Sequence, residues 1–590
     1  MATRACKRMD TANYTDVVIV GNGPSAISLS YLLHGHRPYF NGHAHSNSML
    51  TEKLHHSKTS IVDQDLEFLS EGLEGRSPNP VALLWDSLVH PDADLGAENP
   101  SMLSWKHEPK QAKSHVVLGK MKPGGAWQNM EGSMQTLSQN GWMELPDLPF
   151  RQWLAKRQRR LDFSNNRATT GDVRDYYEEY VEAMGLREHF KDYHTVTAVQ
   201  KLFCTNSCAD CESGEVEPCC QNIRQNHHFL WEVRGYKTLA PPPRSPRESG
   251  TQETRGSSSE DGSTSSDEEF GPEAADSDSG SRCSGGSADK ELGEVDVEGS
   301  ALSASRSSSL GRKSRKSSCS SSNSQDLTNT FGVLSLEREE FCFVTPNVVL
   351  ATGTYDIPNR LGVIGESSTS VIHSLCALEQ RLFDEDLTRT SAPICVVGAG
   401  LSAADAILMA LEAGIPVIHV FRCGPSDPSL IFRKLPQSIY PEYHRVAMLM
   451  KGQVTDELYQ PYPRHRVVEI SHEMVLLKPC LSRPNPSRSP SPHDNDPSII
   501  SVDVSLTVIM IGSRPDLSFL PGGGRDLGVV PKWPIDSKHN PIDVDPFSYQ
   551  STHEQGLFAM GPLVADNFVR FGIGGALGIA NHLSQAAENP

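Results

Sequence analysis

The sequence predicts an α/β protein with two Rossmann-like dinucleotide-binding domains and a long disordered insertion. A short apolar strand, a glycine-rich turn and an apolar helix open the chain, and the same succession recurs from Ile394. Between residues 240 and 330, serine, glycine and acidic residues replace the large apolar ones. Such a segment buries too little apolar surface to offset its ordering entropy, so we expect it to be disordered.

The first unit carries a dinucleotide fingerprint. Residues 16–20, DVVIV, contain a short apolar β-branched run after Asp16, as expected for a buried parallel strand, and residues 26–33 suit the following helix. Between them the chain fits G-x-G-x-x-G/A: a tight turn, a close approach for pyrophosphate, and a small residue for helix packing. The amide groups and dipole at the helix start favour phosphate. The predicted contacts are Gly21, Gly23, Pro24, Ser25 and Ala26.

One expected part of the first fingerprint is missing. A carboxylate about 20 residues further on normally binds the adenosine ribose. Here residues 36–40 read HRPYF and contain no acid. Asp63, Asp65 or a backbone group remain as substitutes.

The second fingerprint follows residues 394–397, and its predicted contacts are Gly398, Gly400, Ser402 and Ala403. The next expected strand covers residues 416–421, and Arg422 follows it directly. An arginine in place of the ribose acid favours a 2′-phosphate, and therefore NADPH over NADH. Arg433 and Lys434 are candidates to share this role, and the alternative is that Arg422 is an ordinary surface charge.

The remaining elements are expected between and after these units. The apolar periodicity predicts a helix that ends at Gly185 and a strand that ends at Gly512. It also predicts a strand, a loop and a helix in the tail, and strands at 196–203, 229–233, 341–344 and 347–351. The predicted organisation is a first dinucleotide-binding domain at 1–239 with a helical insert, a linker at 240–330, and a continuation of the first domain at 331–390. An NADPH-binding domain follows at 391–515 with a disordered patch at 481–498, and residues 516–590 return to the first domain.

Composition excludes several classes of function. The net charge of −19 opposes nucleic acid or an anionic membrane as the main partner. The first residues lack a secretory apolar run, and no stretch approaches the roughly 18 apolar residues of a membrane span. Thirteen cysteines, mostly scattered, fit a reducing compartment, so a cytoplasmic location is expected.

Two features allow alternative interpretations. Cys204, Cys208, Cys211, Cys219 and Cys220 are either loop thiols or part of a zinc site, and the irregular spacing favours thiols, so no metal site is predicted. In the linker, serines beside basic residues at 306–307 and 312–317 are either kinase sites or parts of a solvated spacer. Protein partners of this chain are expected to bind through the linker.

Three further segments resemble flavin-dependent monooxygenases. They are the GG-x-W segment around residue 125, the A-T-G stretch that ends at residue 353, and the closing segment in the tail. The acid that usually follows the strand glycine is replaced by Pro562, and the resemblance assigns its role to Asp566. The resemblance implies that the first domain, at 1–239, 331–390 and 516–590, binds FAD. The additional FAD contacts that it implies are Gly124, Gly125, Trp127, Thr352, Gly353, Asp566, Asn567 and Phe568.

The chain more closely resembles the oxidative stress-induced growth inhibitor family. SIVDQDLEFLSEGLEGRS is a specific segment, and GGAWQNMEGSM, DPSLIFRKLPQSIYPEYH, NPIDVDPFSYQST and the tail GPLVADNFVRFGIGGALG also carry the resemblance, which does not cover the linker. It implies an FAD- and NADPH-linked monooxygenase fold related to lysine and ornithine N-hydroxylases. It also implies growth restraint, cell death under oxidative stress, and a role in late cell division at the midbody.

The expected function is therefore an FAD-dependent, NADPH-consuming monooxygenase whose substrate and catalytic residues the sequence does not identify. Two rivals remain. One is an NADPH oxidase or reductase that transfers no oxygen atom and uses the same two sites. The other is a scaffold whose flavin fold has lost turnover.

Overall fold

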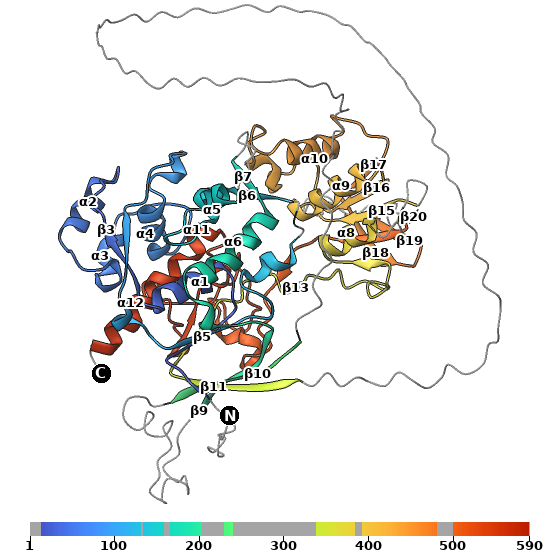
Figure 1. Cartoon of the computed structure of the whole chain (residues 1–590). Helices are drawn as coiled ribbons and strands as arrows, with labels where there is room; N and C mark the ends of the chain where they lie inside the picture. Colours follow the sequence, from blue (N-terminus) through green and yellow to red (C-terminus); the bar gives the residue numbers. More distant parts are fainter. Residues whose placement is uncertain are drawn as a thin grey trace, which may run out of the picture. The chain divides into compact units, whose positions relative to one another are not determined.

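A parallel sheet of five strands carries the first glycine turn, and Figure 1 labels one of these strands, β5 (His115–Leu118). The computed structural model describes residues 13–130, 132, 134–157, 166–202, 229–239, 338–383, 387, 392–480 and 499–588. The sheet order is β23 (Leu557–Ala559), β12 (Asn347–Leu350), β2 (Val17–Val20), β5 (His115–Leu118) and β8 (Phe190–Lys191). All neighbouring pairs are parallel. β2 is the central strand of this order, and it is buried at every residue.

A second parallel sheet of five strands carries the other turn. Its order is β14 (Val371–Ile372), β21 (Leu506–Ile509), β15 (Ile394–Val397), β16 (Val417–Phe421) and β17 (Tyr459–Pro463). On one face, Ile394 and Val396 share a core with α9 (Leu401–Glu412) and α10 (Pro441–Lys451). On the other, Cys395 and Val397 pack with an antiparallel sheet. The predicted fold class, two Rossmann-like units, is confirmed.

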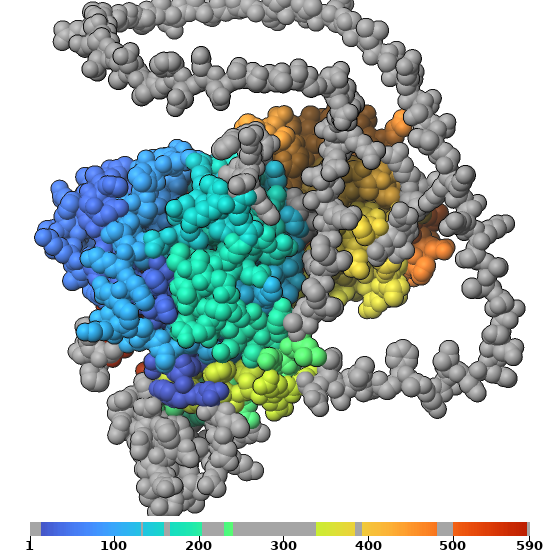
Figure 2. Space-filling view, in the orientation of Figure 1, coloured from blue at the N-terminus to red at the C-terminus, as the bar shows by residue number. Residues whose placement is uncertain are grey.

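The segment after the first helix differs from the prediction. β3 (His36–Phe40) does not join the parallel sheet but pairs antiparallel with β4 (Leu103–His107). Between them lie α2 (Ser48–His55), α3 (Leu66–Ser70) and α4 (Pro80–Val89). These blue and light-blue residues form much of one side of the surface in Figure 2. Consequently β5, and not residues 36–40, is the strand beside β2.

A four-stranded sheet matches the strands predicted on both sides of the linker. It consists of β1 (Asn13–Tyr14), β11 (Glu339–Thr345), β10 (Leu230–Lys237) and β9 (His194–Leu202). The predicted helix before Gly185 is α6 (Thr170–Ala183), whose three buried tyrosines donate hydrogen bonds to the backbone of residues 143–148. Gly185 has φ +70°, as expected after a helix.

The C-terminal tail returns to the first unit. α1 (Pro24–Leu33) packs against α12 (Gly574–Glu588), which also contacts α4, and α11 (Val569–Gly572) precedes α12. The other regular elements are α5 (Phe150–Lys156), α8 (Leu375–Phe383), β6 (Gln135–Gln139), β7 (Arg167–Thr169), β13 (Ile357–Pro358), β18 (His465–Ile470), β19 (Met474–Pro479), β20 (Ile500–Asp503) and β22 (Ser513–Arg514).

Some expectations fall on residues that the structure does not describe. The linker at 240–330, the cysteine cluster at 204–220 and the patch at 481–498 lie outside the described residues. Within the described part of the chain, none of the helices has both the length and the apolar character required to traverse a lipid bilayer.

Candidate functional site

The first glycine turn leaves β2 and enters α1 with the geometry that a diphosphate requires. Gly21 has φ +107°, and a Cβ there would overlap the carbonyl oxygen of Ala351, so only glycine fits. Gly23 forms the N-cap of α1, and a Cβ built on it meets nothing within 4 Å. The turn is therefore closed on the side of the sheet and open in front of the helix.

The start of α1 is suited to an anion. No side chain caps this helix, and its first turn contains no acidic residue. Pro24 occupies the first turn, where its missing N–H is not needed. Ala26 is fully buried, as the third position of the fingerprint requires, and Ser25 Oγ lies beside the backbone of Gly561 and Gly572.

The GG-x-W segment lies against this turn. The Gly124 N–H donates to the carbonyl of Asn22 at 2.9 Å, and a Cβ on Gly125 would approach the Cα of Gly23 to 2.9 Å. Trp127 packs edge-on against Tyr177, with ring centroids 6.2 Å apart. The structure thus brings together two motifs separated by about one hundred residues in the sequence.

The A-T-G stretch meets the same turn from the other side. Thr352 follows β12, and its backbone nitrogen lies 2.9 Å from a Cβ built on Gly21. The Thr352 hydroxyl is buried and has no hydrogen-bond partner among the described residues. Gly353 has φ +68° and open space beside it. Because buried hydroxyls normally have a partner, this one marks a place for a polar ligand.

Asp566 differs from the other predicted contacts. It is 1% exposed, and its carboxylate accepts hydrogen bonds from Ser77 at 2.5 Å, Asn79 at 2.9 Å and Tyr549 at 3.2 Å. Burial raises the pKa of the Asp566 carboxyl to about 7. With these three hydrogen bonds, both oxygens of the Asp566 carboxyl have protein donors. The neighbouring Asn567 and Phe568 are exposed.

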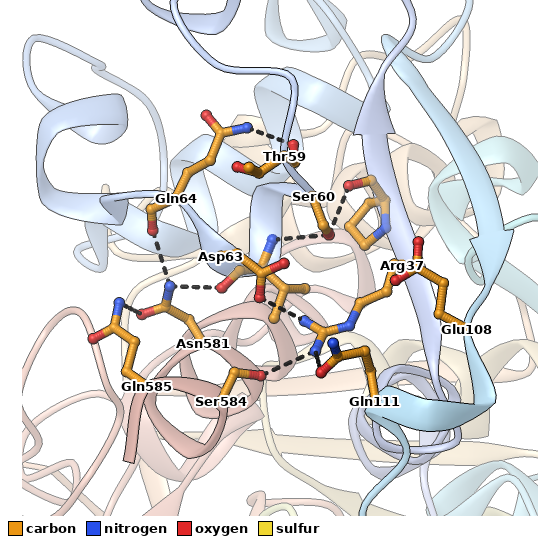
Figure 3. Close-up of polar contacts among 12 residues, drawn as sticks. Arg37, Thr59, Ser60, Asp63, Gln64, Glu108, Gln111, Asn581, Ser584 and Gln585 are labelled. Carbon is orange, nitrogen blue, oxygen red and sulfur yellow. Dashed lines mark hydrogen bonds and ion pairs between the residues drawn. The ribbon is translucent and has the colours of Figure 1, made fainter. Parts of the chain in front are cut away.

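The region expected to hold a ribose acid instead holds a buried arginine (Figure 3). Arg37 in β3 is 3% exposed and donates to Asp63, Gln111 and Ser584. Asp63, one expected substitute, is therefore bound to Arg37. Asp65, the other, accepts from the N–H of Phe68 at the start of α3. The spacing rule for the ribose acid points to residues 36–40, but this strand pairs with β4 and does not lie beside β2.

In a dinucleotide-binding fold the ribose acid stands at the end of the strand beside the fingerprint strand, and here that strand is β5. The residue at this position is Gly119, and a Cβ there would overlap the side chain of Asn22. The Asn22 amide donates to the Met121 carbonyl at 2.7 Å and is 4% exposed. Asn22 thus fills the place where an acid would stand. Sequence reasoning missed this residue, although the run HVVLGKMKPGGAW could have indicated the strand.

The second glycine turn repeats the first. Gly398 has φ +140°, and a Cβ there would overlap the carbonyl oxygen of Met510 at the end of β21. Gly400 forms the N-cap of α9 and, like Gly23, has nothing within 4 Å of a built Cβ. No side chain caps α9, its first turn contains no acid, Ala403 is buried and Ser402 is partly exposed.

A buried histidine that sequence reasoning missed supports the second turn. His419 in β16 donates from Nε2 to the Gly398 carbonyl at 2.6 Å, and its Nδ1 accepts from the Tyr459 hydroxyl at 2.7 Å. Burial lowers the pKa of His419 to about 4, so the ring is neutral. A polar residue within the apolar run VIHVF was the available signal.

Two arginines lie near the end of β16. Arg422 is exposed directly after the strand. The Arg464 guanidinium lies 3.4 Å from a Cβ built on Gly424, two residues later. Arg433 and Lys434 are also exposed. The sequence identified three of these residues but not Arg464, which the structure brings close through β17 and its following turn.

These observations describe two turns of matching geometry at the carboxyl ends of two parallel sheets. Each has an open glycine at the start of an uncapped helix, which is an arrangement that binds the diphosphate of a dinucleotide. None of the five cysteines that the structure describes forms a disulfide with another described residue, and Cys395 is buried in β15.

Comparison with known proteins finds relatives that match the chain over almost its whole length. The chain is 38% identical to human oxidative stress-induced growth inhibitor 1, covering 96% of this chain and 94% of that protein. It is 37% identical to human oxidative stress-induced growth inhibitor 2, covering 96% and 93%. Among known structures, a bacillithiol disulfide reductase from Bacillus cereus matches with a TM-score of 0.48, 13% identity and coverage of 97% and 99%. No protein-family model matches the sequence.

Proposed function

The chain belongs to the oxidative stress-induced growth inhibitor family, and from this premise we propose that it is an FAD- and NADPH-dependent oxidoreductase of the monooxygenase type. The observation that carries the proposal is the repeated turn. Gly23 and Gly400 each leave open space before an uncapped helix, and Gly21 and Gly398 each allow that turn to lie against a neighbouring strand. Two dinucleotide sites in one chain favour electron transfer between the two cofactors.

The residues around the first turn fit FAD. Gly23 and the start of α1 would hold the diphosphate, with Gly124, Gly125 and Trp127 covering it, and the Thr352 hydroxyl is available to a polar group. Asn22 would contact the adenosine ribose in place of the usual carboxylate. When bound, the flavin would accept hydride from NADPH and pass electrons to oxygen. The protein's own task is to hold the rings in place and exclude water.

The second turn fits NADPH. Gly400 and the start of α9 would hold the diphosphate, while the neutral His419 fixes the backbone of Gly398. Arg422 and Arg464 are positioned near the end of β16, where a 2′-phosphate would lie. Arginine suits this role because its planar group offers several donors to phosphate.

Arg422→Ala is expected to weaken NADPH far more than NADH. Hydrogen bonds to charged groups contribute about 1.5–3 kcal/mol, so we expect roughly a 10- to 100-fold rise in the NADPH dissociation constant. Stopped-flow reduction of the bound flavin at varied nucleotide concentration measures both constants. Lys451→Ala, in the last turn of α10, is the control for loss of a positive charge. An equal loss for NADPH and NADH would refute the 2′-phosphate assignment.

We propose that this activity serves growth regulation under oxidative stress, because the relatives that define the family are named as growth inhibitors induced by oxidative stress. We propose that it also contributes to cell death and to late cell division in the cytoplasm and at the midbody. The substrate is a small molecule or a protein side chain that the reduced flavin can oxygenate.

An absorbance experiment tests the proposed function. Purified full-length protein is expected to show flavin absorption that bleaches when NADPH is added without oxygen. On admission of air, the spectrum recovers. Oxygenated product in proportion to NADPH supports the monooxygenase, whereas peroxide alone supports an oxidase. A colourless protein that neither binds added FAD nor oxidises NADPH would favour the scaffold.

A further inference from the structure

Five histidines gather at the edge of the first sheet opposite the glycine turn. His115 is the first residue of β5, and His34 follows the last residue of α1. His36 and His107 are paired across β3 and β4, and His189 ends the short helix η6 (Arg187–His189). The glycine turn, in contrast, follows the last residues of β2. The histidines are therefore separate from the proposed nucleotide sites.

Three of these rings lie within reach of a single ion. One ring nitrogen from each of His34, His36 and His107 lies within 4.8 Å of the other two. His36 and His107 stack with centroids 4.4 Å apart, and His34 and His107 with centroids 5.2 Å apart. His36 also stacks on Tyr31 at 3.9 Å, which restricts its ring.

The hydrogen bonds determine which nitrogens carry hydrogens. The His107 Nε2 donates to the His34 carbonyl at 3.2 Å, and the His189 Nδ1 donates to the His115 carbonyl at 3.3 Å, because a carbonyl only accepts. The His189 Nε2 is then an acceptor, so the His34 Nδ1, 2.9 Å away, is the donor. This leaves lone pairs on the His34 Nε2 and the His107 Nδ1.

That pattern is the one found in metal-binding histidines. Such a ring usually donates its second N–H to a carbonyl or another acceptor, which fixes its tautomer and orientation.

We propose that His34, His36 and His107 form a binding site for a divalent transition-metal ion, with Zn²⁺ as the preferred ion. Three imidazoles and one water satisfy the tetrahedral coordination of zinc. The ring planes lie 11–27° from one another, so binding requires at least one ring to turn. His107 is exposed and can make this movement. His189 would position the His34 ring by accepting the hydrogen of the His34 Nδ1 at its Nε2.

Metal titration of the full-length protein tests the site. After removal of metal with a chelator, Zn²⁺ affinity is measured by competition with a chromophoric chelator. His107→Gln is expected to weaken binding by at least the roughly 10- to 100-fold that loss of a supporting residue costs. His472→Gln, an exposed histidine elsewhere, is the matched control and should leave the affinity unchanged.

Co²⁺ distinguishes this site from one made of cysteines. Imidazole and water ligands should give visible d–d bands without the near-ultraviolet charge-transfer band of thiolates, and His107→Gln should abolish those bands. Equal Zn²⁺ affinity in His107→Gln and His472→Gln would overturn the proposal, as would a Co²⁺ spectrum of thiolate ligation alone. Because neither measurement uses a nucleotide, its result is independent of the proposed oxidoreductase function.

Discussion

Gly23→Val is expected to give a folded protein that no longer retains FAD. Gly23 has φ −75° and ψ −177°, which valine adopts without strain, and a Cβ there meets nothing within 4 Å. The side chain would project into the space before α1 where the diphosphate must approach. We expect FAD affinity to fall at least about 100-fold, or roughly 2.8 kcal/mol. Absorbance of the purified protein and titration with added FAD measure this loss.

The thermal unfolding of Gly23→Val shows whether the loss is local. Without added FAD, its transition should match that of wild-type protein from which the flavin has been removed. A variant that still purifies with a full complement of FAD would contradict the assignment of the first turn.

Gly400→Val is expected to leave FAD in place and to abolish its reduction by NADPH. Gly400 has φ −98° and ψ −174°, and its surroundings are equally open. The added side chain would block the diphosphate at α9 without touching the first sheet. We expect the rate of anaerobic flavin bleaching at fixed NADPH to fall at least about 100-fold, while dithionite still reduces the flavin.

The two variants serve as controls for each other. Loss of FAD in Gly400→Val together with retention in Gly23→Val would exchange the two assignments. Normal reduction by NADPH in Gly400→Val would remove the second site from the mechanism.

The two glycine turns were predictable because their chemistry is local. A strand, a turn and a helix lie within about twenty residues, and each small residue has a steric reason that the sequence shows directly. The Ala351 and Met510 carbonyls that exclude a side chain at Gly21 and Gly398 could not be named in advance, but the need for glycine could.

The ribose contact was not predictable by the same reasoning. The spacing rule assumes that the strand after α1 joins the sheet beside β2. Here β3 pairs with β4 instead, and the neighbouring strand β5 begins only at His115. The run HVVLGKMKPGGAW indicates a strand there, but nothing in the sequence places that strand beside β2 or puts the Asn22 side chain next to Gly119.

The partners of Asp566 and the histidine cluster depend on contacts distant in sequence. Ser77, Asn79 and Tyr549 reach Asp566 through separate loops, and His34 meets His189 because α1 and η6 end at the same edge of the sheet. No periodicity or spacing in the sequence indicates that these side chains contact one another, so these contacts could not be predicted.

The strand order of the first sheet determines when the proposed flavin site can form during synthesis. β2 leaves the ribosome first, but its partner β12 begins at Asn347 and the outer strand β23 at Leu557. Every strand of the second sheet lies between Val371 and Ile509, so that sheet can assemble while the tail is still being translated. Because distant pairings form late, the first sheet is completed only when the chain is nearly finished. If the first turn binds flavin as proposed, its capture is a late event in the maturation of the protein, and truncations near the C-terminus should remove the cofactor before they disturb the second sheet.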